Sequence, residues 1–459
     1  MKYTAINIGP IIKTLGMARK PRELWAASYL FSYLMKCLID ELSENKIVSP
    51  ATNAPTEVGV GLYPDRVFVE GEINLDAIEK ALFNFSQATE LPMDKVKSYF
   101  NVMMTSVDCE EVSKAVADLN QKLNCMELFE RVTDDKSAQE VWNLLLTKYN
   151  SPLFKVAFGT RRFDIPDLKQ IARNGENDIK YSYSNYVCVV YADGDNMGKI
   201  VSQSNSISDI SKALLKFGKT ATETIRDYSD YALPIYAGGD DLLFIAPVCS
   251  KGKNIFDLID DLDKKYEDVK KVADSTDLQT SMSYGVAVSY YKYPLYEILY
   301  TAQNLLHSTA KNVLGKNAVA LELRKHSGGT FAVQFSKNDE KLKKAFADVV
   351  ASSSVEESVV SAVSHKIRNN EGILKLWLGD ANANERNTCF YRKFMEYDER
   401  GTSKDNEYKK KSLNLLNELY KKYEGKQNEQ EIVISQLVKT MYGMLRTGKF
   451  IKGEEALDE

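Results

Sequence analysis

Two pairs of aspartates stand out as residues suited to metal-dependent chemistry. Asp193 and Asp195 end an apolar stretch rich in valine and tyrosine, and Asp240 and Asp241 follow two glycines between the apolar runs PIYA and LLFIAP. A strand end beside a hairpin tip would bring these carboxylates together, and such a cluster is costly unless cations neutralise it. Hard oxygen ligands suit Mg²⁺ or Mn²⁺. We therefore predict Asp193, Asp240 and Asp241 as catalytic metal ligands and rank Asp195 below them.

Glycines and lysines near the aspartates are suited to holding a nucleotide. Paired glycines let the backbone bend sharply and let a nucleotide approach without meeting a Cβ atom. The stretch DGDNMGK predicts a strand-to-helix turn whose amides can cradle phosphates, and two lysines downstream supply cations. The predicted nucleotide-binding residues are Gly194, Asn196, Gly198, Gly238, Gly239, Ser281, Lys311 and Lys316.

Each of these features also has a plainer interpretation. Gly-Gly-Asp-Asp suits an ordinary hairpin turn, and each lysine alone suits a surface charge. Because alternate strand residues face opposite sides, Asp240 and Asp241 both bind a metal only if the turn breaks the alternation. Ser281 and Tyr284 are candidates to contact a base, with a buried structural role as the alternative. Acids, glycines and lysines together favour a nucleotidyl-transferring or nucleotide-cyclising site.

The elements that would position these residues form a second α/β unit. Apolar strands are predicted at 186–195, in a hairpin over 233–247, at 281–291 and at 317–323. Helices are predicted at 207–226, 254–272 and 294–311. The order β-α-β-β-α-β with a central antiparallel hairpin is that of a ferredoxin-like or palm domain.

The rest of the chain divides into three further segments. A strand at 3–12, a helix at 22–43, a strand pattern at 59–71 and a helix from Leu75 predict a smaller α/β unit. Residues 91–149 contain no glycine and are predicted to be helical. Residues 151–178 are predicted to form an irregular connector, and the chain from about residue 338 is predicted to be helical. The predicted domains are 1–90, 91–178, 179–335 and 336–459.

Composition excludes several classes of protein. With 60 basic and 64 acidic side chains, the net charge of −4 argues against a free-standing nucleic-acid binder that works by neutralising phosphates. The six cysteines are scattered, which excludes a typical zinc ribbon, and none of the three histidines precedes an aspartate. We see neither a signal peptide nor a membrane-spanning run, so we expect a soluble, cytoplasmic protein.

The motifs DGDNMGK, AGGDD, SYGVAVS and AK-x₃-GKN resemble the catalytic palm of the GGDEF and CRISPR-polymerase superfamily. A diguanylate cyclase is disfavoured, because Leu242 stands where that family has phenylalanine and YALPIYA lacks its Arg-x-x-Asp motif. PRELWAASYLFSYLMK, YPDRVF and RRFDIPDLKQIA more narrowly resemble the large subunit of type III-B (Cmr-type) CRISPR effector complexes. This resemblance implies an α+β fold with two ferredoxin-like palm domains, a helical linker and a C-terminal helical domain.

The resemblance implies that residues 1–90 form a degenerate palm that completes the nucleotide pocket. It implies ATP as substrate, Mg²⁺ on Asp193, Asp240 and Asp241, and synthesis of cyclic oligoadenylate for antiviral defence once guide CRISPR RNA pairs with target RNA. The resemblance implies other Cmr-type subunits as partners and implies no association with a membrane. The family's His-Asp nuclease motif and zinc cysteines are not found, so we do not expect DNA cleavage. The alternatives are transfer of AMP to S-adenosylmethionine, a structural subunit, and a template-directed polymerase, for which no basic finger or thumb is found.

Overall fold

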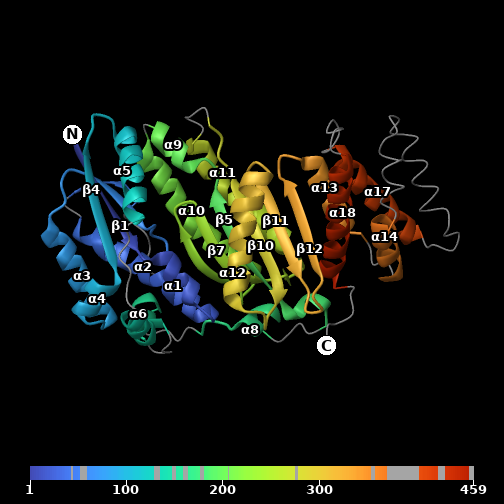
Figure 1. The fold of residues 1–459 in the computed structure, drawn as a ribbon, viewed down its shortest axis with the longest axis horizontal. Coiled ribbons are helices and arrows are strands. Elements are labelled where there is room, and N and C mark those ends of the chain that lie inside the picture. The colour runs from blue at the N-terminus through green and yellow to red at the C-terminus, as the bar shows by residue number, and fades with distance from the viewer. Residues whose placement is uncertain are drawn as a thin grey trace.

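The computed structural model is elongated, and its parts follow one another along the long axis in chain order (Figure 1). A small sheet lies at one end, a larger sheet occupies the centre, and helices of the last part lie at the other end. The structure describes residues 1–42, 45–51, 59–128, 135–146, 151–158, 164–175, 180–204, 206–273, 278–352, 357–369, 403–421 and 430–453.

The N-terminal part is a complete ferredoxin-like unit, called the first palm here. Its elements are β1 (Lys2–Gly9), α2 (Pro21–Glu41), β2 (Lys46–Ser49), β3 (Arg66–Glu70), α3 (Leu75–Thr89) and β4 (Asn101–Asp108), with a short helix α1 (Ile11–Met17) after β1. The strand order is β2-β3-β1-β4, and β1 pairs antiparallel with both β3 and β4. The sheet is thus completed by a strand beyond the predicted boundary at residue 90.

The expectation that residues 91–149 are all helical is wrong for β4. This strand lies at the edge of its sheet, and seven of its eight residues are half-buried, so it lacks the alternating pattern that identifies a strand. It also follows α4 (Met93–Tyr99) almost directly and is followed by α5 (Val112–Glu127), without a glycine between. The connector beyond contains short helical segments: α6 (Asp135–Val141), η2 (Trp142–Leu146), α7 (Pro152–Phe158), α8 (Leu168–Ala172) and η3 (Ser182–Asn185).

The central part contains the predicted second palm. Its elements are β5 (Tyr186–Gly194), α9 (Met197–Gln203), α10 (Ile207–Tyr228), β6 (Leu233–Gly238), β7 (Asp241–Pro247), the small strands β8 (Cys249–Ser250) and β9 (Lys253–Asn254), α11 (Ile255–Ala273), β10 (Met282–Tyr290), α12 (Leu295–Asn304), the π-helical η4 (Leu305–Val313), β11 (Ala318–Arg324) and β12 (Thr330–Ser336). The large sheet has the order β12-β11-β10-β5-β7-β6. The β-α-β-β-α-β prediction is confirmed, and β11 and β12 extend the sheet.

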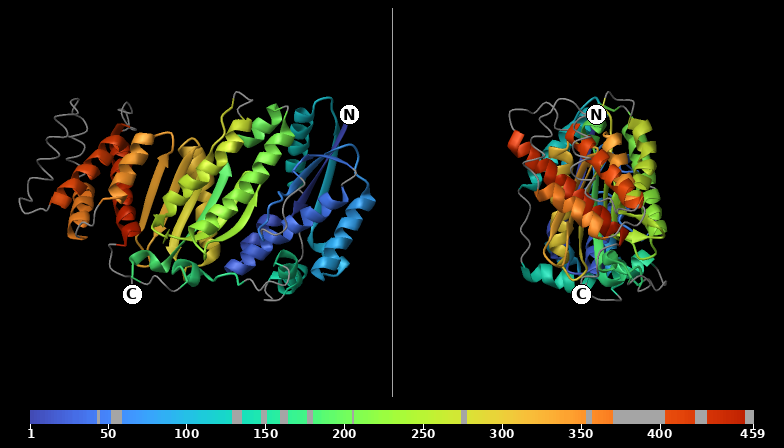
Figure 2. Two further views of the ribbon diagram at one scale, coloured as in Figure 1. Left: turned by 180° about the vertical axis from the view of Figure 1, so that it is seen from behind. Right: turned by 90° about the vertical axis from the view of Figure 1, so that its right-hand side faces the viewer.

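Both faces of the large sheet are covered, which explains why β5 reads as a continuous apolar run. Helices α10 and α11 cover the face seen in Figure 2, left, and α12 covers the face seen in Figure 1. Along β5, Cys188 and Val190 pack toward α10 and α11, whereas Val187 and Val189 pack toward α12 and the first palm. Each such buried side chain stabilises the fold by about 1.5–3 kcal/mol.

Among the described residues, the last part consists of helices with short turns at their ends, as predicted. It consists of α13 (Glu340–Val350), α14 (Glu357–Asn369), α17 (Ser403–Lys421) and α18 (Gln430–Lys452), and α18 packs along the edge strand β12 (Figure 1). No helix among the described residues is both long enough and apolar enough to cross a membrane.

The two palms are joined by direct backbone contact. The amide of Ala237 in β6 donates a hydrogen bond to the carbonyl of Gly61 in the first palm, at 2.9 Å. The side chain of Trp25 in α2 donates to the carbonyl of Gly59 at 2.9 Å, which holds the same loop. This loop therefore fixes the first palm beside the hairpin that carries Asp240 and Asp241.

Candidate active site between the two palms

Asp193 and Asp241 lie directly opposite each other on paired strands. Asp193 is near the end of β5, Asp241 begins β7, and the antiparallel register pairs the two residues. Side chains at paired positions have Cβ atoms about 4.5–5.5 Å apart, so both carboxylates reach the same space. The hairpin loop consists of Gly239 and Asp240, and Gly239 has a φ of +65°, which favours glycine there.

Asp240 occupies a different place from Asp241. A Cβ atom added to Gly194 would lie 2.7 Å from the Asp240 Cβ and 2.7 Å from the Tyr266 hydroxyl, so Asp240 packs over this glycine. The amide of Gly194 also donates to the carbonyl of Asp240 at 3.1 Å. Asp193 and Asp241 line the pocket between the palms, and Asp240 is not among its lining residues. Within the described residues, no group of three acidic, histidine or cysteine side chains forms a ready-made metal cluster.

Lys311 supplies the positive charge next to Asp193. Its Nζ lies 2.6 Å from Asp193 Oδ1 and 3.3 Å from the carbonyl of Gly194. It extends from η4, which packs tightly on β10 because Gly285 has no side chain. The lysine predicted for phosphate binding is therefore brought to the predicted aspartates by a helix 118 residues further along the chain.

The carboxylates perturb one another electrostatically. Loss of hydration, followed by the negative charge of Asp193, raises the pKa of Asp240 to about 7. Loss of hydration among the strand ends, and then Asp240 and Asp193, also raises the pKa of Asp241. Lys311 opposes both shifts. One lysine thus leaves the site short of positive charge, and the oxygen donors of Asp193 and Asp241 fit Mg²⁺ or Mn²⁺.

Some of the remaining predicted residues lie at the site, and others hold the surrounding strands and turns in place. Lys316 Nζ donates to Asn196 Oδ1 at 2.5 Å, in the turn after β5. Ser281 donates to the buried Asp195 at 2.6 Å, so its hydroxyl supports the strand end. Tyr284 is fully buried and donates to Asp263 at 2.9 Å, so the base-contact interpretation is wrong for this residue.

The four predicted glycines have different surroundings. The backbone of Gly194 is covered by Asp240, and a Cβ atom on Gly238 would lie 2.4 Å from the Tyr236 hydroxyl. Gly239 provides the turn, and Gly198 is exposed with open space around its Cβ position. Close packing therefore explains Gly194 and Gly238, whereas the structure shows no crowding that requires glycine at residue 198.

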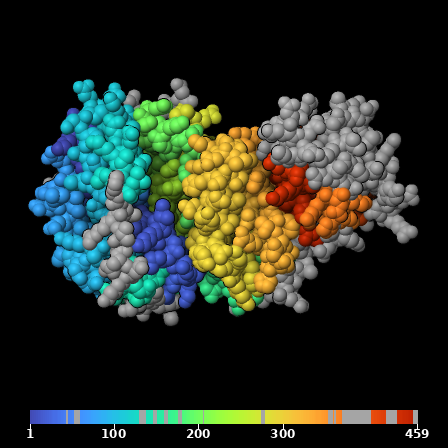
Figure 3. Space-filling view, in the orientation of Figure 1, coloured from blue at the N-terminus to red at the C-terminus, as the bar shows by residue number. Residues whose placement is uncertain are grey.

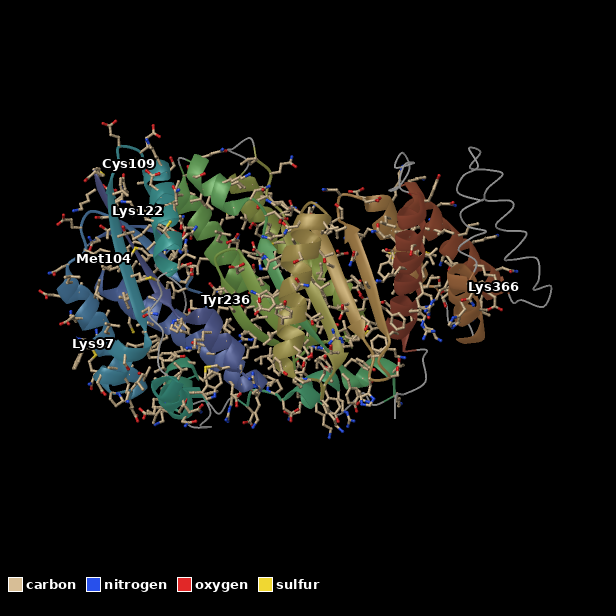
Figure 4. The ribbon with its side chains drawn as sticks, viewed as in Figure 1. Lys97, Met104, Cys109, Lys122, Tyr236 and Lys366 are labelled. Atoms are coloured by element: carbon tan, nitrogen blue, oxygen red, sulfur yellow. The ribbon has the colours of Figure 1, made fainter. Side chains whose placement is uncertain are left out.

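A pocket of about 290 Å³ contains the two opposed carboxylates. On the face shown in Figure 3, the surface is hollowed between the first palm and the helices drawn in yellow. One wall comes from β5, β7 and η4, and the other from β1, α1, α2 and the segment before β3. Tyr236 lines it where the palms meet, left of centre in Figure 4. The pocket thus needs both palms.

Sequence analysis missed the pocket residues Asp65, Tyr191, Tyr236, Gln303 and His307. Asp65 precedes β3 of the first palm, and its negative charge contributes to the raised pKa of Asp241. His307 stands four residues before Lys311 on one helical stretch, a spacing that places both on one side. The four-residue spacing from Lys311 could have identified His307 as a pocket residue from sequence, whereas no local sequence pattern identifies Asp65.

In the first palm, an amide and a guanidinium stand where the second palm has the Asp193–Asp241 pair. The first sheet, β2-β3-β1-β4, matches the β6-β7-β5-β10 part of the large sheet, and the first residue of β3 pairs with β1 as Asp241 pairs with Asp193. The paired residues there are Asn7 and Arg66. Glu127 accepts from Asn7 Nδ2 at 2.7 Å and from Arg66 Nη2 at 2.6 Å. A built-in guanidinium occupies the position of an acid, so this palm cannot hold a metal in the same way.

Comparison with known proteins identifies relatives of both palms. Residues 186–320 match the family described as Cas10/Cmr2, second palm domain, and residues 3–70 match the CRISPR-associated protein Cmr2, N-terminal. The chain is similar to the CRISPR system Cmr subunit Cmr2 of Pyrococcus furiosus, with 30% identity over 174 residues. The match covers 32% of this chain and only 19% of that relative.

Solved structures share the fold along most of the chain. A Csm1–Csm4 cassette in complex with cA4 has a TM-score of 0.59 at 13% identity, covering 97% of this chain and 69% of that one. A type III-B Cmr-beta structure in the apo state has a TM-score of 0.54 at 11% identity, covering 88% and 78%. Another Csm1–Csm4 cassette was solved with one ATP and has a TM-score of 0.52. The predicted resemblance to Cmr-type large subunits is confirmed.

Proposed function

We propose that this Cmr2-like chain is the nucleotidyltransferase of a type III-B CRISPR complex and makes a signalling nucleotide from ATP. The observation that most supports this proposal is the position of Asp193 and Asp241. The two carboxylates lie opposite each other on paired strands, Lys311 lies beside Asp193, and the pocket that contains them is built by both palms. Fold relatives solved with ATP and with cA4 support the substrate and the product class. The proposed product is cyclic oligoadenylate.

In the proposed reaction, the 3′-hydroxyl of one ATP attacks the α-phosphate of another, and pyrophosphate leaves. Asp193 and Asp241 would hold Mg²⁺ or Mn²⁺, which when bound stabilises charge on the attacking and leaving oxygens. Lys311 lies beside Asp193 and would contact the phosphates, and Lys316 would hold the triphosphate from the next turn. Asp240, packed over Gly194, would hold the hairpin and add negative charge behind the metal.

The proposed activity depends on an assembly with other proteins and RNA. We propose that other Cmr-type subunits, guide CRISPR RNA and target RNA surround it, and that pairing of the two RNAs activates synthesis. The net charge of −4 supports a subunit that meets RNA through an assembly.

One observation favours a second acceptor, S-adenosylmethionine. The pocket places Asp65 of the first palm with Asp193 and Asp241. A third carboxylate in this space disfavours a second triphosphate and favours a cationic acceptor, such as a sulfonium carrying an ammonium group. In this variant the AMP of ATP is joined to S-adenosylmethionine, and pyrophosphate leaves as before.

The test uses the complex assembled with guide and target RNA, ATP and Mg²⁺, with and without S-adenosylmethionine. Products are identified by mass spectrometry. We expect a product only when target RNA is present, and its loss in Asp193→Asn and Asp241→Asn. Asp260→Asn is the matched control, because Asp260 pairs with Lys343 outside the pocket.

Two further outcomes test the acceptor and the enzyme function. Asp65→Asn should reduce conjugation to S-adenosylmethionine at least tenfold if the carboxylate holds its ammonium, and should leave oligoadenylate synthesis intact. Absence of any nucleotide product under all conditions would refute the enzyme function and leave a structural subunit.

A further inference from the structure

Asp195 is a buried carboxylate to which the proposed reaction gives no role. It is only 1% exposed, and no lysine or arginine pairs with it among the described residues. Its oxygens instead accept hydrogen bonds from Ser281 Oγ at 2.6 Å, from Ser283 Oγ at 2.9 Å and from the backbone amide of Asn317 at 2.9 Å. A carboxylate removed from water without a cation is costly unless donors satisfy it. These three donors are therefore bound firmly to Asp195.

The amide of Asn317 belongs to a strained loop. Gly315, Lys316 and Asn317 have φ angles of +79°, +75° and +43°, three successive left-handed residues of which only the first is glycine. Left-handed conformations of other residues persist only where surrounding contacts hold them. Three contacts hold the backbone of this loop. Lys316 N–H donates to the Ala310 carbonyl at 3.0 Å, Asn317 N–H donates to Asp195, and the Asn317 carbonyl accepts from the Lys337 amide at 2.6 Å.

This loop directs Lys316 toward the active site. Its Nζ reaches Asn196, the residue after Asp195, and Asn196 is itself held by a hydrogen bond to the carbonyl of Gln279 at 3.1 Å. One carboxylate therefore fixes the loop on one side, while the neighbouring Asn196 receives the lysine on the other.

We propose that Asp195 is a positioning residue for nucleotide binding, which holds the loop of residues 315–317 so that the Lys316 ammonium meets the triphosphate. This inference rests on the proposed function, because it takes a nucleoside triphosphate as the ligand of Lys316. Asp195 contacts neither the nucleotide nor the metal. Its loss should therefore weaken ATP binding and leave the chemical step nearly unchanged.

Kinetics of variants in the assembled complex test this role. Asp195→Ala and Lys316→Ala should each raise the KM for ATP about tenfold, with kcat within about threefold of the wild type. The double variant should be no worse than either single variant, because both remove the same contact. Asp195→Asn keeps a hydrogen-bond acceptor and should recover part of the loss, and Asp260→Asn should behave as wild type.

Two measurements on the uncomplexed full chain separate this inference from the proposed function. Hydrogen exchange at the Asn317 amide should become at least tenfold faster in Asp195→Ala, while amides in the middle of α11 keep their protection. Titration with ATP and Mg²⁺ should show weaker binding by the same variant. If the wild type makes no product but both effects are seen, the proposed function fails and the positioning role stands. Additive losses in the double variant, or unchanged exchange at Asn317, overturn the positioning role.

Discussion

Gly285 determines how closely η4 approaches the sheet, and replacing it with alanine should displace Lys311. A Cβ atom at this position would lie 2.1 Å from the Ala302 carbonyl oxygen and 2.4 Å from the Leu306 amide nitrogen. Ordinary contact begins near 3.4 Å, so the helix must move by about 1.3 Å. The 2.6 Å ion pair between Lys311 and Asp193 cannot survive a shift of that size intact.

Two magnitudes follow for Gly285→Ala. Overpacking of this kind costs about 1–3 kcal/mol, which lowers the melting temperature by roughly 2–12 °C in a domain of this size. A misplacement of about 1 Å at catalytic groups reduces the rate on the order of 100-fold. We therefore expect a folded protein that has lost most of its nucleotide synthesis.

The assay combines thermal melting with product formation in the assembled complex. Gly16→Ala is the control, because Gly16 lies in α1 with no atom within 4 Å of its Cβ position, and alanine is the better helix former there. The control should melt at or slightly above the wild-type temperature. If Gly285→Ala forms product at the wild-type rate with an unchanged melting temperature, then η4 does not position Lys311 as argued.

Three further predictions concern charge. Lys311→Met should reduce the initial rate of nucleotide synthesis at least tenfold, because it removes the cation beside Asp193, and an unchanged rate would contradict its role. Since the pKa of Asp240 is raised to about 7, the metal-free fold should lose stability as pH rises from about 4 to 7, and Mg²⁺ should raise the melting temperature more at pH 8 than at pH 6. Arg66→Leu should cost about 1–2 kcal/mol by freeing Glu127, as measured by denaturant unfolding, and should not alter the effect of Mg²⁺.

The juxtaposition of Asp193 and Asp241 could be predicted from sequence because its signals are local. Asp193 and Asp241 each stand at the boundary of an apolar strand, and the hairpin motif fixes which strands are neighbours. The structure places the two adjacent acids differently, since Asp241 lines the pocket and Asp240 packs over Gly194. These outcomes depend on strand geometry, which a few adjacent residues determine.

The rest of the site depends on how the palms pack. Asp65 lies in the pocket because the loop that contains Gly61 is joined to β6 by a backbone hydrogen bond. No sequence pattern near Asp65 predicts that contact. For Tyr284 the sequence left a base contact and a buried structural role open, and the structure supports the buried role, because the side chain is fully buried and donates to Asp263. Edge strand β4 was missed because half-buried residues carry no clear period.

The two palms contribute unequally to the pocket, because only the second palm carries paired carboxylates there. If both halves carried paired carboxylates, a nucleotide could react in either orientation, and the two outcomes would be equivalent. In the first palm, Asn7 and Arg66 replace that pair and bond to Glu127 outside the pocket, whereas Asp193 and Asp241 line the pocket. Only one orientation of a nucleotide therefore places a phosphate beside paired carboxylates able to hold a metal. Under the proposed function, the protein distinguishes donor from acceptor before either is bound, and a growing product would be extended from one end alone.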